Sequence, residues 1–330
     1  MESQILVENV SKSYKTYIKG DGIINSLAGL FHRKYEFIHA VRNISFTVNP
    51  GEILGLIGLN GAGKTTTIKM VSGIIKPDKG NIKVLGCDPF LRSYHYRKNV
   101  SLVMGQKGQL DPDLSVIDSI KLYASIYSID KKEALYRAKM MAEELNMAEV
   151  DLQKQVRNLS LGQRMKGELI LSFIHLPTIV FLDEPTLGLD FITQRTIRDY
   201  LKNYKRKYNA SIILTSHYIT DIEDLCDNIY ILNKGQPLYY GTIENLKCMV
   251  PNIRKVQFSA SEHTINSIRE QLCREVYKDD TSENVYSVRF RPDEMMEIMQ
   301  VLSRGKDITN INFHEDTLDI IIESLYKNCK

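Results

Sequence analysis

The sequence has few cysteines, and their placement argues against disulfide bonds and zinc sites. The chain of 330 residues contains five cysteines, an odd number. They are scattered widely, and no two of them form a Cys-x-x-Cys pair. Disulfide-stabilised scaffolds and zinc modules both depend on clustered cysteines at regular spacings. We therefore expect reduced thiols, as in a cytoplasmic protein.

The sequence also lacks a stretch that could cross a membrane. Its longest apolar run, from Leu169 to Leu182, is interrupted by His175 and Pro177 and is shorter than the roughly 20 residues that a membrane helix needs. The first ten residues contain two acids and no basic stretch before an apolar segment, so we expect no signal peptide. Work at a membrane would then require a partner protein.

An excess of charge of one sign is missing as well. The formal net charge of +3 is small for this length, and no basic field marks the protein as a nucleic-acid binder. The composition, 43% hydrophobic and 25% charged, is that of an ordinary globular protein long enough for two domains.

What the sequence does contain is a set of short apolar strands that end in polar residues. Residues 53–57, 179–182 and 211–214 have the pattern of buried parallel strands. Residues 53–57 are followed by Gly58, residues 179–182 by Asp183, and residues 211–214 by the polar cluster Thr215, Ser216 and His217. Ligands of such sheets bind at the carboxyl ends of the strands. The pattern predicts an α/β fold with one site formed by the three strand ends.

Two further segments complete the predicted organisation. Residues 89–157 have no such strand after about Met104 and carry helical patterns, which predicts a helical subdomain inserted into the α/β core. No motif with a recognisable chemical role follows residue 250. We therefore expect one domain over residues 1–250 and an accessory domain over 251–330. The order βαββαβα in the second part predicts a small ferredoxin-like α+β domain. Its expected strands are 254–258, 276–279, 285–290 and 308–313, and its expected helices are 262–274, 293–303 and 317–328.

A glycine-rich segment after the first of these strands matches the P-loop pattern. Its glycines let backbone N–H groups turn toward phosphate oxygens, and the helix expected from Thr66 adds its positive N-terminus. Lys64 is expected to reach the β- and γ-phosphates of a nucleotide, and the Thr65 hydroxyl to coordinate Mg²⁺. The expected phosphate-binding residues are Gly58, Leu59, Asn60, Gly61, Ala62, Gly63, Lys64, Thr65 and Thr66.

Two consecutive carboxylates follow the second strand. Asp183 at the strand end is expected to hold magnesium, and Glu184 to polarise the attacking water as a general base. A hydrophobic strand followed by Asp-Glu is a weak signal by itself, and its meaning depends on the other motifs.

Residues 158–164, Asn-Leu-Ser-Leu-Gly-Gln-Arg, resemble the LSGGQ signature of ABC ATPases. The resemblance covers the first ~245 residues and implies a P-loop NTPase fold. It implies that Ser160, Gly162 and Gln163 contact the γ-phosphate of an ATP held by a second chain, so that a dimer encloses two ATP molecules. Leu161 departs from the family pattern, which often has glycine there.

The same resemblance assigns roles to three further residues. Gln106 resembles the Q-loop glutamine, which senses magnesium and the membrane partner. Asp190 resembles the D-loop aspartate, and His217 the switch histidine that contacts the γ-phosphate. The family often stacks an aromatic side chain on adenine just after the first strand. Tyr14 fits this position, and Tyr17 or Tyr35 are alternatives.

These observations lead us to expect an ATP-hydrolysing subunit of an ABC transporter, with ATP and Mg²⁺ as cofactors. A homodimer would act on separate permease subunits at the cytoplasmic face of the membrane, and the resemblance to bacterial export ATPases favours export. ABC ATPases that act on ribosomes or DNA fit less well, because the chain has neither a second P-loop nor a long coiled coil. The signature argues against a kinase or GTPase.

The insertion at residues 22–34 predicts an amphipathic helix. Ile23, Ile24, Leu27, Leu30 and Phe31 fall on one face of a helical wheel, within an arc of about 120°. This face would contact the permease or the membrane surface, or pack on the protein's own sheet.

Overall fold

The computed structural model describes residues 3–17, 35–105, 108–249, 254–272, 275–278, 284–305, 307–314 and 318–328. The segment 22–34 and Gln106 lie outside this described part. The chain divides into two compact units, Met1–Thr242 and Ile243–Lys330. The second unit thus begins eight residues before the expected boundary, because helix α10 (Ile243–Met249) belongs to it.

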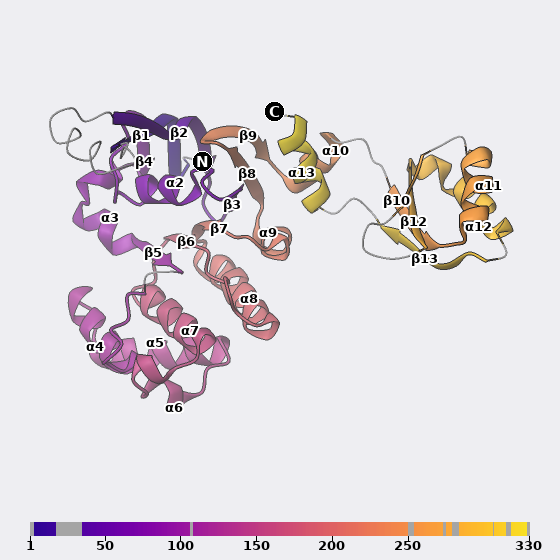
Figure 1. The fold of residues 1–330 in the computed structure, drawn as a ribbon. Helices are drawn as coiled ribbons and strands as arrows, with labels where there is room; N and C mark the ends of the chain where they lie inside the picture. The colour runs from indigo at the N-terminus through magenta and orange to yellow at the C-terminus, as the bar shows by residue number, and fades with distance from the viewer. Residues whose placement is uncertain are drawn as a thin grey trace, which may run out of the picture. The chain divides into compact units, whose positions relative to one another are not determined.

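A six-stranded sheet runs through the centre of the first unit (Figure 1). Its strand order is β5-β6-β7-β3-β8-β9, and all neighbours are parallel except β9, which is antiparallel to β8. The three apolar strands expected from the sequence are therefore adjacent, as β6, β7 and β3. The strands are β3 (Ile53–Gly58), β5 (Val100–Met104), β6 (Ile179–Asp183), β7 (Ser211–Thr215), β8 (Asn228–Asn233) and β9 (Gln236–Gly241).

A second, antiparallel sheet has the order β2-β1-β4. It consists of β1 (Ile5–Tyr17), β2 (Tyr35–Val48) and β4 (Lys79–Val84). Its buried face shares one apolar core with the central sheet and with helix α2 (Lys64–Val71), in which Ile44, Ile68 and Leu56 are fully buried. Burial of these side chains holds the start of α2 between the two sheets.

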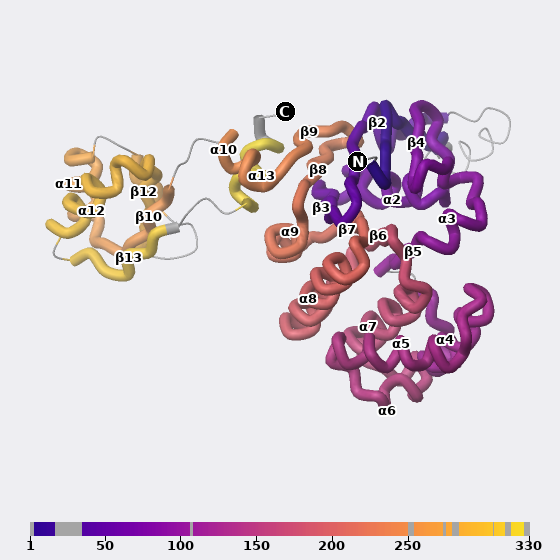
Figure 2. Tube along the Cα trace, turned by 180° about the vertical axis from the view of Figure 1, so that it is seen from behind, coloured from indigo at the N-terminus to yellow at the C-terminus, as the bar shows by residue number. Residues whose placement is uncertain are grey.

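The helices of the inserted subdomain gather below the sheets in Figure 1, and the reverse view in Figure 2 shows the same grouping. They are α4 (Val116–Ile126), α5 (Lys131–Glu144), α6 (Glu149–Leu152) and α7 (Leu161–Phe173), with a 3-10 turn at Val156–Asn158. Ser115 and Asp130 cap α4 and α5 through their side chains. The helical region therefore extends past residue 157, the limit expected from the sequence.

The other helices in the described part of the first unit connect the strands. They are α3 (Tyr94–Asn99), preceded by a 3-10 turn at Pro89–Leu91, then α8 (Phe191–Tyr208) and α9 (Ile219–Leu225). No helix in the described ranges is both long enough and apolar enough to span a bilayer.

The second unit contains the predicted βαββαβα order. Its antiparallel sheet has the order β11-β12-β10-β13, the arrangement of a ferredoxin-like sandwich. Helices α11 and α12 bury Ile268 and Leu302 against Val256 and Val288 of the sheet. The elements are β10 (Arg254–Ser259), α11 (Glu262–Leu272), β11 (Val276–Lys278), β12 (Val285–Phe290), a 3-10 turn (Pro292–Glu294), α12 (Met295–Arg304), β13 (Thr309–His314) and α13 (Leu318–Asn328).

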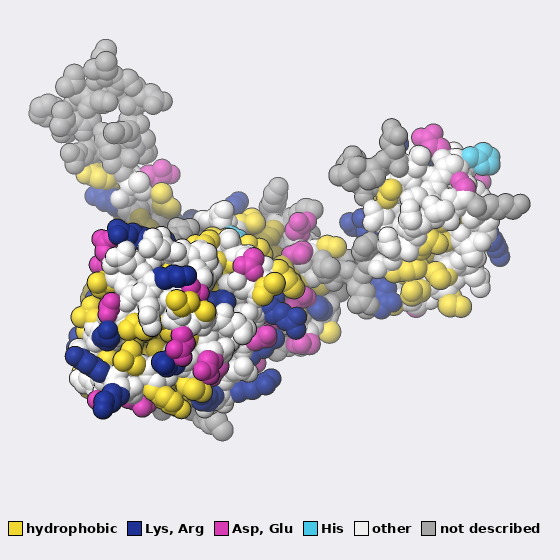
Figure 3. Space-filling model, turned by 90° about the horizontal axis from the view of Figure 1, so that it is seen from below, with side chains coloured by type: hydrophobic (Ala, Val, Ile, Leu, Met, Phe, Trp, Pro, Cys, Tyr) yellow, Lys and Arg dark blue, Asp and Glu magenta, His cyan; other side chains and the backbone are white. Residues whose placement is uncertain are grey.

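The surface seen in Figure 3 carries Lys, Arg, Asp and Glu side chains interspersed with apolar ones. On this face charges of one sign do not gather in a single patch, in agreement with the small net charge of the sequence.

Candidate active site

The loop between β3 and α2 is shaped by glycines. Gly61 and Gly63 have φ angles of 78° and 104°, in the left-handed region that favours glycine. A Cβ atom at Gly63 would also lie 2.5 Å from the carbonyl oxygen of Ala40 on β2. Helix α2 begins at Lys64, two residues earlier than expected, and its N-terminus faces this loop. The loop and the helix start thus form a cradle of a shape and polarity that suit an anion.

Lys64 lies inside the cradle. Its Nζ donates to the carbonyl oxygens of Gly58 (2.6 Å) and Leu59 (3.4 Å), and the residue is buried. Burial lowers the pKa of Lys64, and the nearby Glu184 and Asp183 partly offset this effect. The ammonium group is therefore positioned by the loop carbonyls beside the loop's own N–H groups.

Asp183, at the carboxyl end of β6, links two hydroxyl groups. Its Oδ1 accepts a hydrogen bond from Thr215 Oγ1 (2.8 Å) and one from Thr65 Oγ1 (3.2 Å). Thr65 is on α2 and Thr215 ends β7, so three elements meet at this carboxylate. A carboxylate and a hydroxyl beside a phosphate cradle suit Mg²⁺, which takes few protein ligands together with phosphate oxygens. A cluster of three or more His, Cys, Asp or Glu side chains fit for a metal is absent from the described residues.

Glu184 has an unusual backbone conformation. Its φ is 57°, a left-handed value that a residue other than glycine adopts only when its surroundings enforce it. Its N–H donates to Thr215 Oγ1 (3.0 Å) and to the Thr215 carbonyl oxygen (3.2 Å). Its Oε1 lies 2.8 Å from His217 Nε2. The structure therefore brings the predicted base and the predicted switch histidine into direct contact.

The loop before Gln106 contacts the backbone of Asp183 and Glu184. Gly105 N donates to the Asp183 carbonyl oxygen (2.8 Å), and a Cβ atom at Gly105 would lie 2.6 Å from the Glu184 carbonyl oxygen. Gln106 itself lies outside the described residues. Its role as the Q-loop glutamine therefore stays a prediction from the sequence.

A cavity of about 620 Å³ lies next to the cradle. Residues 60–66 and Glu184 form one side of it, and residues of β2 form another. Phe37 of β2 lines this cavity and is 59% exposed, whereas Tyr14 does not line it and is paired with Ile38 across the β1–β2 ladder. Tyr17 and Tyr35 do not line it either. Sequence reasoning missed Phe37, because which strand residues face the loop depends on the register of β1 and β2.

The signature residues lie at a different helix start. Ser160 caps α7 by accepting from Gln163 N (3.2 Å), and Ser160 N donates to Gln163 Oε1 (2.9 Å). Gln163 Nε2 also donates to Asp151 Oδ2 (2.8 Å). This reciprocal capping box holds the Gln163 side chain in the chain's own helix start. None of the signature residues lines the cavity at the P-loop.

Asp190 is likewise engaged within its own helix. Its carboxylate caps α8, with Oδ1 accepting from Thr193 N (2.9 Å) and Oδ2 from Thr193 Oγ1 (2.7 Å). These hydrogen bonds lower the pKa of Asp190. A Cβ atom at Gly162 would lie 3.2 Å from Thr193 Oγ1, so the signature and the start of α8 are neighbours. Within one chain these residues serve as helix caps.

Comparison with known proteins agrees with this geometry. A family model described as ABC transporter matches residues 41–187. The uncharacterized ABC transporter ATP-binding protein MJ1023 of Methanocaldococcus jannaschii is 37% identical over 205 residues, which cover 62% of this chain and 72% of that protein. The ABC transporter ATP-binding protein NatA of Bacillus subtilis is 28% identical over 216 residues, covering 66% of this chain and 87% of that protein.

A solved structure shows the same fold. It is the dimeric, post-hydrolysis structure of the ATP-binding cassette MJ0796 bound to ADP and Pi, with a TM-score of 0.62 and 21% identity. The match covers 72% of this chain and 98% of that one. Taken together with the P-loop, the acid pair and the signature, these relationships show that the chain belongs to the family of ABC transporter ATP-binding proteins, which are P-loop ATPases.

Proposed function

We propose that the chain binds ATP in the cavity at its P-loop and hydrolyses it with Glu184 as general base, to drive transport by a separate permease. The observation that carries this proposal is the contact of 2.8 Å between Glu184 Oε1 and His217 Nε2, at the ends of adjacent strands beside Lys64. A carboxylate that can act as a base and an imidazole that can orient it meet here next to a cradle suited to phosphate, an arrangement that can promote hydrolysis of a phosphoanhydride.

The chemical roles follow from these positions. Glu184 accepts a proton from a water molecule as the water oxygen bonds to the γ-phosphorus, and the bond from that phosphorus to the β–γ bridging oxygen breaks. Lys64 and the loop N–H groups stabilise the negative charge that develops on the phosphate oxygens. His217 orients Glu184 and can donate to the γ-phosphate.

Thr65 and Asp183 are the residues that would hold Mg²⁺. Gln106, which is assigned from the sequence motif, would be a third ligand. When bound, the ion neutralises charge on the β- and γ-phosphates. The hydrogen bond of 3.2 Å between Thr65 Oγ1 and Asp183 Oδ1 supports this assignment, because it brings the two oxygens together.

We further propose that two chains act together. Ser160, Gly162 and Gln163 lie at a helix N-terminus that does not face the chain's own cavity, and such a helix start is suited to a phosphate of another chain's ATP. The neighbour MJ0796 was solved as a dimer, which supports this arrangement. Asp190 would contact the second chain from the adjoining helix start.

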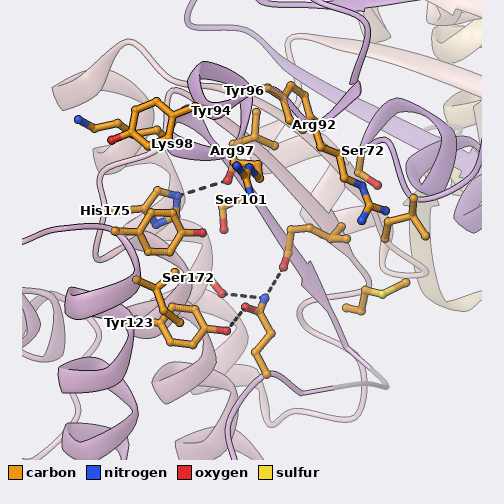
Figure 4. Close-up of a pocket in the computed structure, with 17 residues that line it drawn as sticks. Ser72, Arg92, Tyr94, Tyr96, Arg97, Lys98, Ser101, Tyr123, Ser172 and His175 are labelled. Atoms are coloured by element: carbon orange, nitrogen blue, oxygen red, sulfur yellow. Dashed lines mark hydrogen bonds between the residues drawn. The ribbon is translucent and has the colours of Figure 1, made fainter. Parts of the chain in front are cut away.

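The partner would be a membrane-spanning permease. This protein would bind to its cytoplasmic side as a peripheral subunit, and the permease would export its substrate. A groove of about 560 Å³ offers a docking surface, between α3 and β5 on one side and α4 and α7 on the other (Figure 4). Met104 and Gln109, on either side of Gln106, both line it. The groove is thus continuous with the loop whose glutamine is expected to sense the partner.

The lining of this groove suits a short helix with acidic residues. Arg92, Arg97 and Lys98 contribute positive charge, and among the described residues that line the groove there is no Asp or Glu. Aromatic and aliphatic side chains form much of the remaining wall. Tyr127 stacks on His175 at a centroid distance of 4.0 Å. Burial lowers the pKa of His175 to about 4, so its imidazole is uncharged at neutral pH and the positive charge of the groove comes from Arg92, Arg97 and Lys98.

The groove proposal can be tested with charge insertions. Tyr94→Glu and Ile126→Glu place a carboxylate on exposed groove residues, and we expect them to abolish recruitment to native membrane vesicles while ATP affinity and melting temperature stay unchanged. Tyr136→Glu, on an exposed part of α5 away from the groove, is the matched control. Normal recruitment of both groove variants in a co-sedimentation assay would exclude this surface as the docking site.

The catalytic proposal is tested by Glu184→Gln. This variant keeps the shape of the side chain and removes the base, so hydrolysis should slow by about 10²- to 10⁴-fold while ATP binding persists. The variant should accumulate as an ATP-bound dimer in size-exclusion chromatography. Glu143→Gln, on an exposed part of α5, controls for the loss of one charge. Initial rates near those of the parent would contradict the role of Glu184.

A further inference from the structure

Behind the contact between Glu184 and His217 lies a buried cluster centred on Asp221 in the first turn of α9. Asp221 is 1% exposed, and its Oδ2 accepts hydrogen bonds from Thr186 Oγ1 (2.5 Å) and Ser216 Oγ (2.6 Å). Its Oδ1 accepts from Arg198 Nη1 of α8 (2.8 Å). All four residues are buried, so the guanidinium supplies the positive charge without which a buried carboxylate is unstable.

The two hydroxyls belong to the two loops that carry the reacting pair. Thr186 is two residues after Glu184, and Ser216 directly precedes His217. Both donate to the same oxygen atom, so Asp221 links the two loops to each other. Thr186 and Ser216 each make a further hydrogen bond. Tyr218 N donates to Ser216 Oγ (3.0 Å), and Gln194 Nε2 donates to the Thr186 carbonyl oxygen (3.4 Å).

The backbone between Glu184 and Thr186 needs such support. The φ of 57° at Glu184 is unfavourable for a residue with a side chain, and such conformations persist where surrounding contacts over-determine them. Thr215 holds Glu184 from the strand side through the Glu184 N–H. The Asp221 cluster holds the other end of the same turn, and through Ser216 the histidine loop as well.

We propose that Asp221 is a positioning residue for hydrolysis, which sets the separation of the two loops and thereby the orientation of Glu184 toward His217. The proposal rests on the functions proposed above for these two residues. Asp221 does not touch the cavity at the P-loop, so it acts through Thr186 and Ser216. Arg198 of α8 pairs with the other carboxylate oxygen of Asp221.

The test removes each hydroxyl while the buried ion pair of Asp221 and Arg198 stays intact. Thr186→Val and Ser216→Ala should each lower kcat by roughly tenfold to hundredfold, because small displacements of reacting groups have effects of that size. KM for ATP should change by less than about twofold, since the P-loop is untouched. Thr186→Ser and Ser216→Thr keep a hydroxyl donor and should retain most of the kcat of the parent.

Two control variants remove buried hydroxyls elsewhere in the first unit. Thr196→Val deletes a hydroxyl that bonds to the Ile192 carbonyl oxygen in α8, and Ser119→Ala one that bonds to the Ser115 carbonyl oxygen in α4. We expect melting temperatures to fall to a similar extent in the test and control variants, with kcat lowered in the test variants alone. Equal loss of kcat in the controls would reduce the cluster to a purely stabilising role and overturn the proposal.

Glu184→Gln is measured in parallel to separate the two hypotheses. If Glu184→Gln slows hydrolysis strongly but Thr186→Val and Ser216→Ala keep the kcat of the parent, the proposed function stands and the inference about Asp221 is wrong. If Glu184→Gln hydrolyses ATP at the parent's rate, the proposed function fails, and the positioning role fails with it.

Discussion

Phe37 is the aromatic residue that the structure presents to the cavity at the P-loop. It is 59% exposed and lines that cavity, while Tyr14 is 38% exposed and lies outside its lining. The Tyr14 side chain has Lys12 Nζ 6.0 Å from its ring centroid, and the Tyr35 ring carries Lys15 Nζ at 3.8 Å. Phe37 is therefore our candidate for stacking on an adenine base held in this cavity.

At the scale of the residue, we predict that Phe37→Ala weakens ATP binding more than Tyr14→Ala does. Loss of an aromatic stacking contact should lower the affinity by about twofold to tenfold, the range of single aromatic pairs. Isothermal titration with Mg-ATP on the Glu184→Gln background measures the effect without hydrolysis. Tyr35→Ala is the control on the same strand. A larger loss for Tyr14→Ala than for Phe37→Ala would restore the expectation drawn from the sequence.

At the scale of the element, the start of α7 combines a cap with a predicted phosphate contact. Ser160 and Gln163 satisfy each other's backbone N–H groups, and loss of such a cap costs about 1 kcal/mol. If a substitution at Ser160 destroyed the cap, a loss of activity could therefore result from lower stability and not only from a lost phosphate contact. Asp and Asn both cap helices well, so they change the charge at this position and leave the helix start intact.

We predict that Ser160→Asp abolishes hydrolysis without unfolding α7, because its carboxylate repels the γ-phosphate of the second chain's ATP. Ser160→Asn is the neutral match and should retain more activity. Thermal melting should show both variants within about 1 kcal/mol of the parent. A mixture of Ser160→Asp chains with Lys64→Ala chains should regain part of the activity, since the mixed dimer contains one intact composite site. Full activity of Ser160→Asp alone would exclude a phosphate contact in trans.

At the scale of the whole molecule, every predicted catalytic and nucleotide-binding residue lies in the first unit. Helix α10 belongs to the second unit and contacts α13, and Leu246 of α10 is fully buried. A truncation near residue 250 would keep α10 without α13. A truncation after Thr242 follows the division between the two units instead.

We predict that residues 1–242 bind ATP with the affinity of the full chain. Residues 243–330 would then serve as a dimer brace or regulatory module, or as a plain stabilising cap. Analytical ultracentrifugation with ATP on the Glu184→Gln background distinguishes these roles, because loss of a brace weakens the dimer and leaves nucleotide binding unchanged. A truncated chain that folds, as judged by circular dichroism, yet fails to bind ATP at high concentration would contradict this division of labour.

Much of this organisation could be predicted from the sequence, because it depends on patterns within short segments of the chain. The apolar strands β3, β6 and β7, and the polar residues at their carboxyl ends, follow from local hydrophobic patterns. The P-loop follows from glycine spacing. The same local periodicity predicted the order βαββαβα of the second unit, and the observed sheet order agrees with it.

The tertiary structure decided what depends on contacts between distant residues. Phe37 reaches the cavity through the register of β1 and β2, and no local pattern specifies that register. Gln163 and Asp190 are held as caps by Asp151 and Thr193, which motif matching does not reveal. Asp221 meets Thr186 across 35 positions in sequence. Periodicity reports which face of an element is buried, whereas the identity of the buried partner is set only when strands and helices pack together.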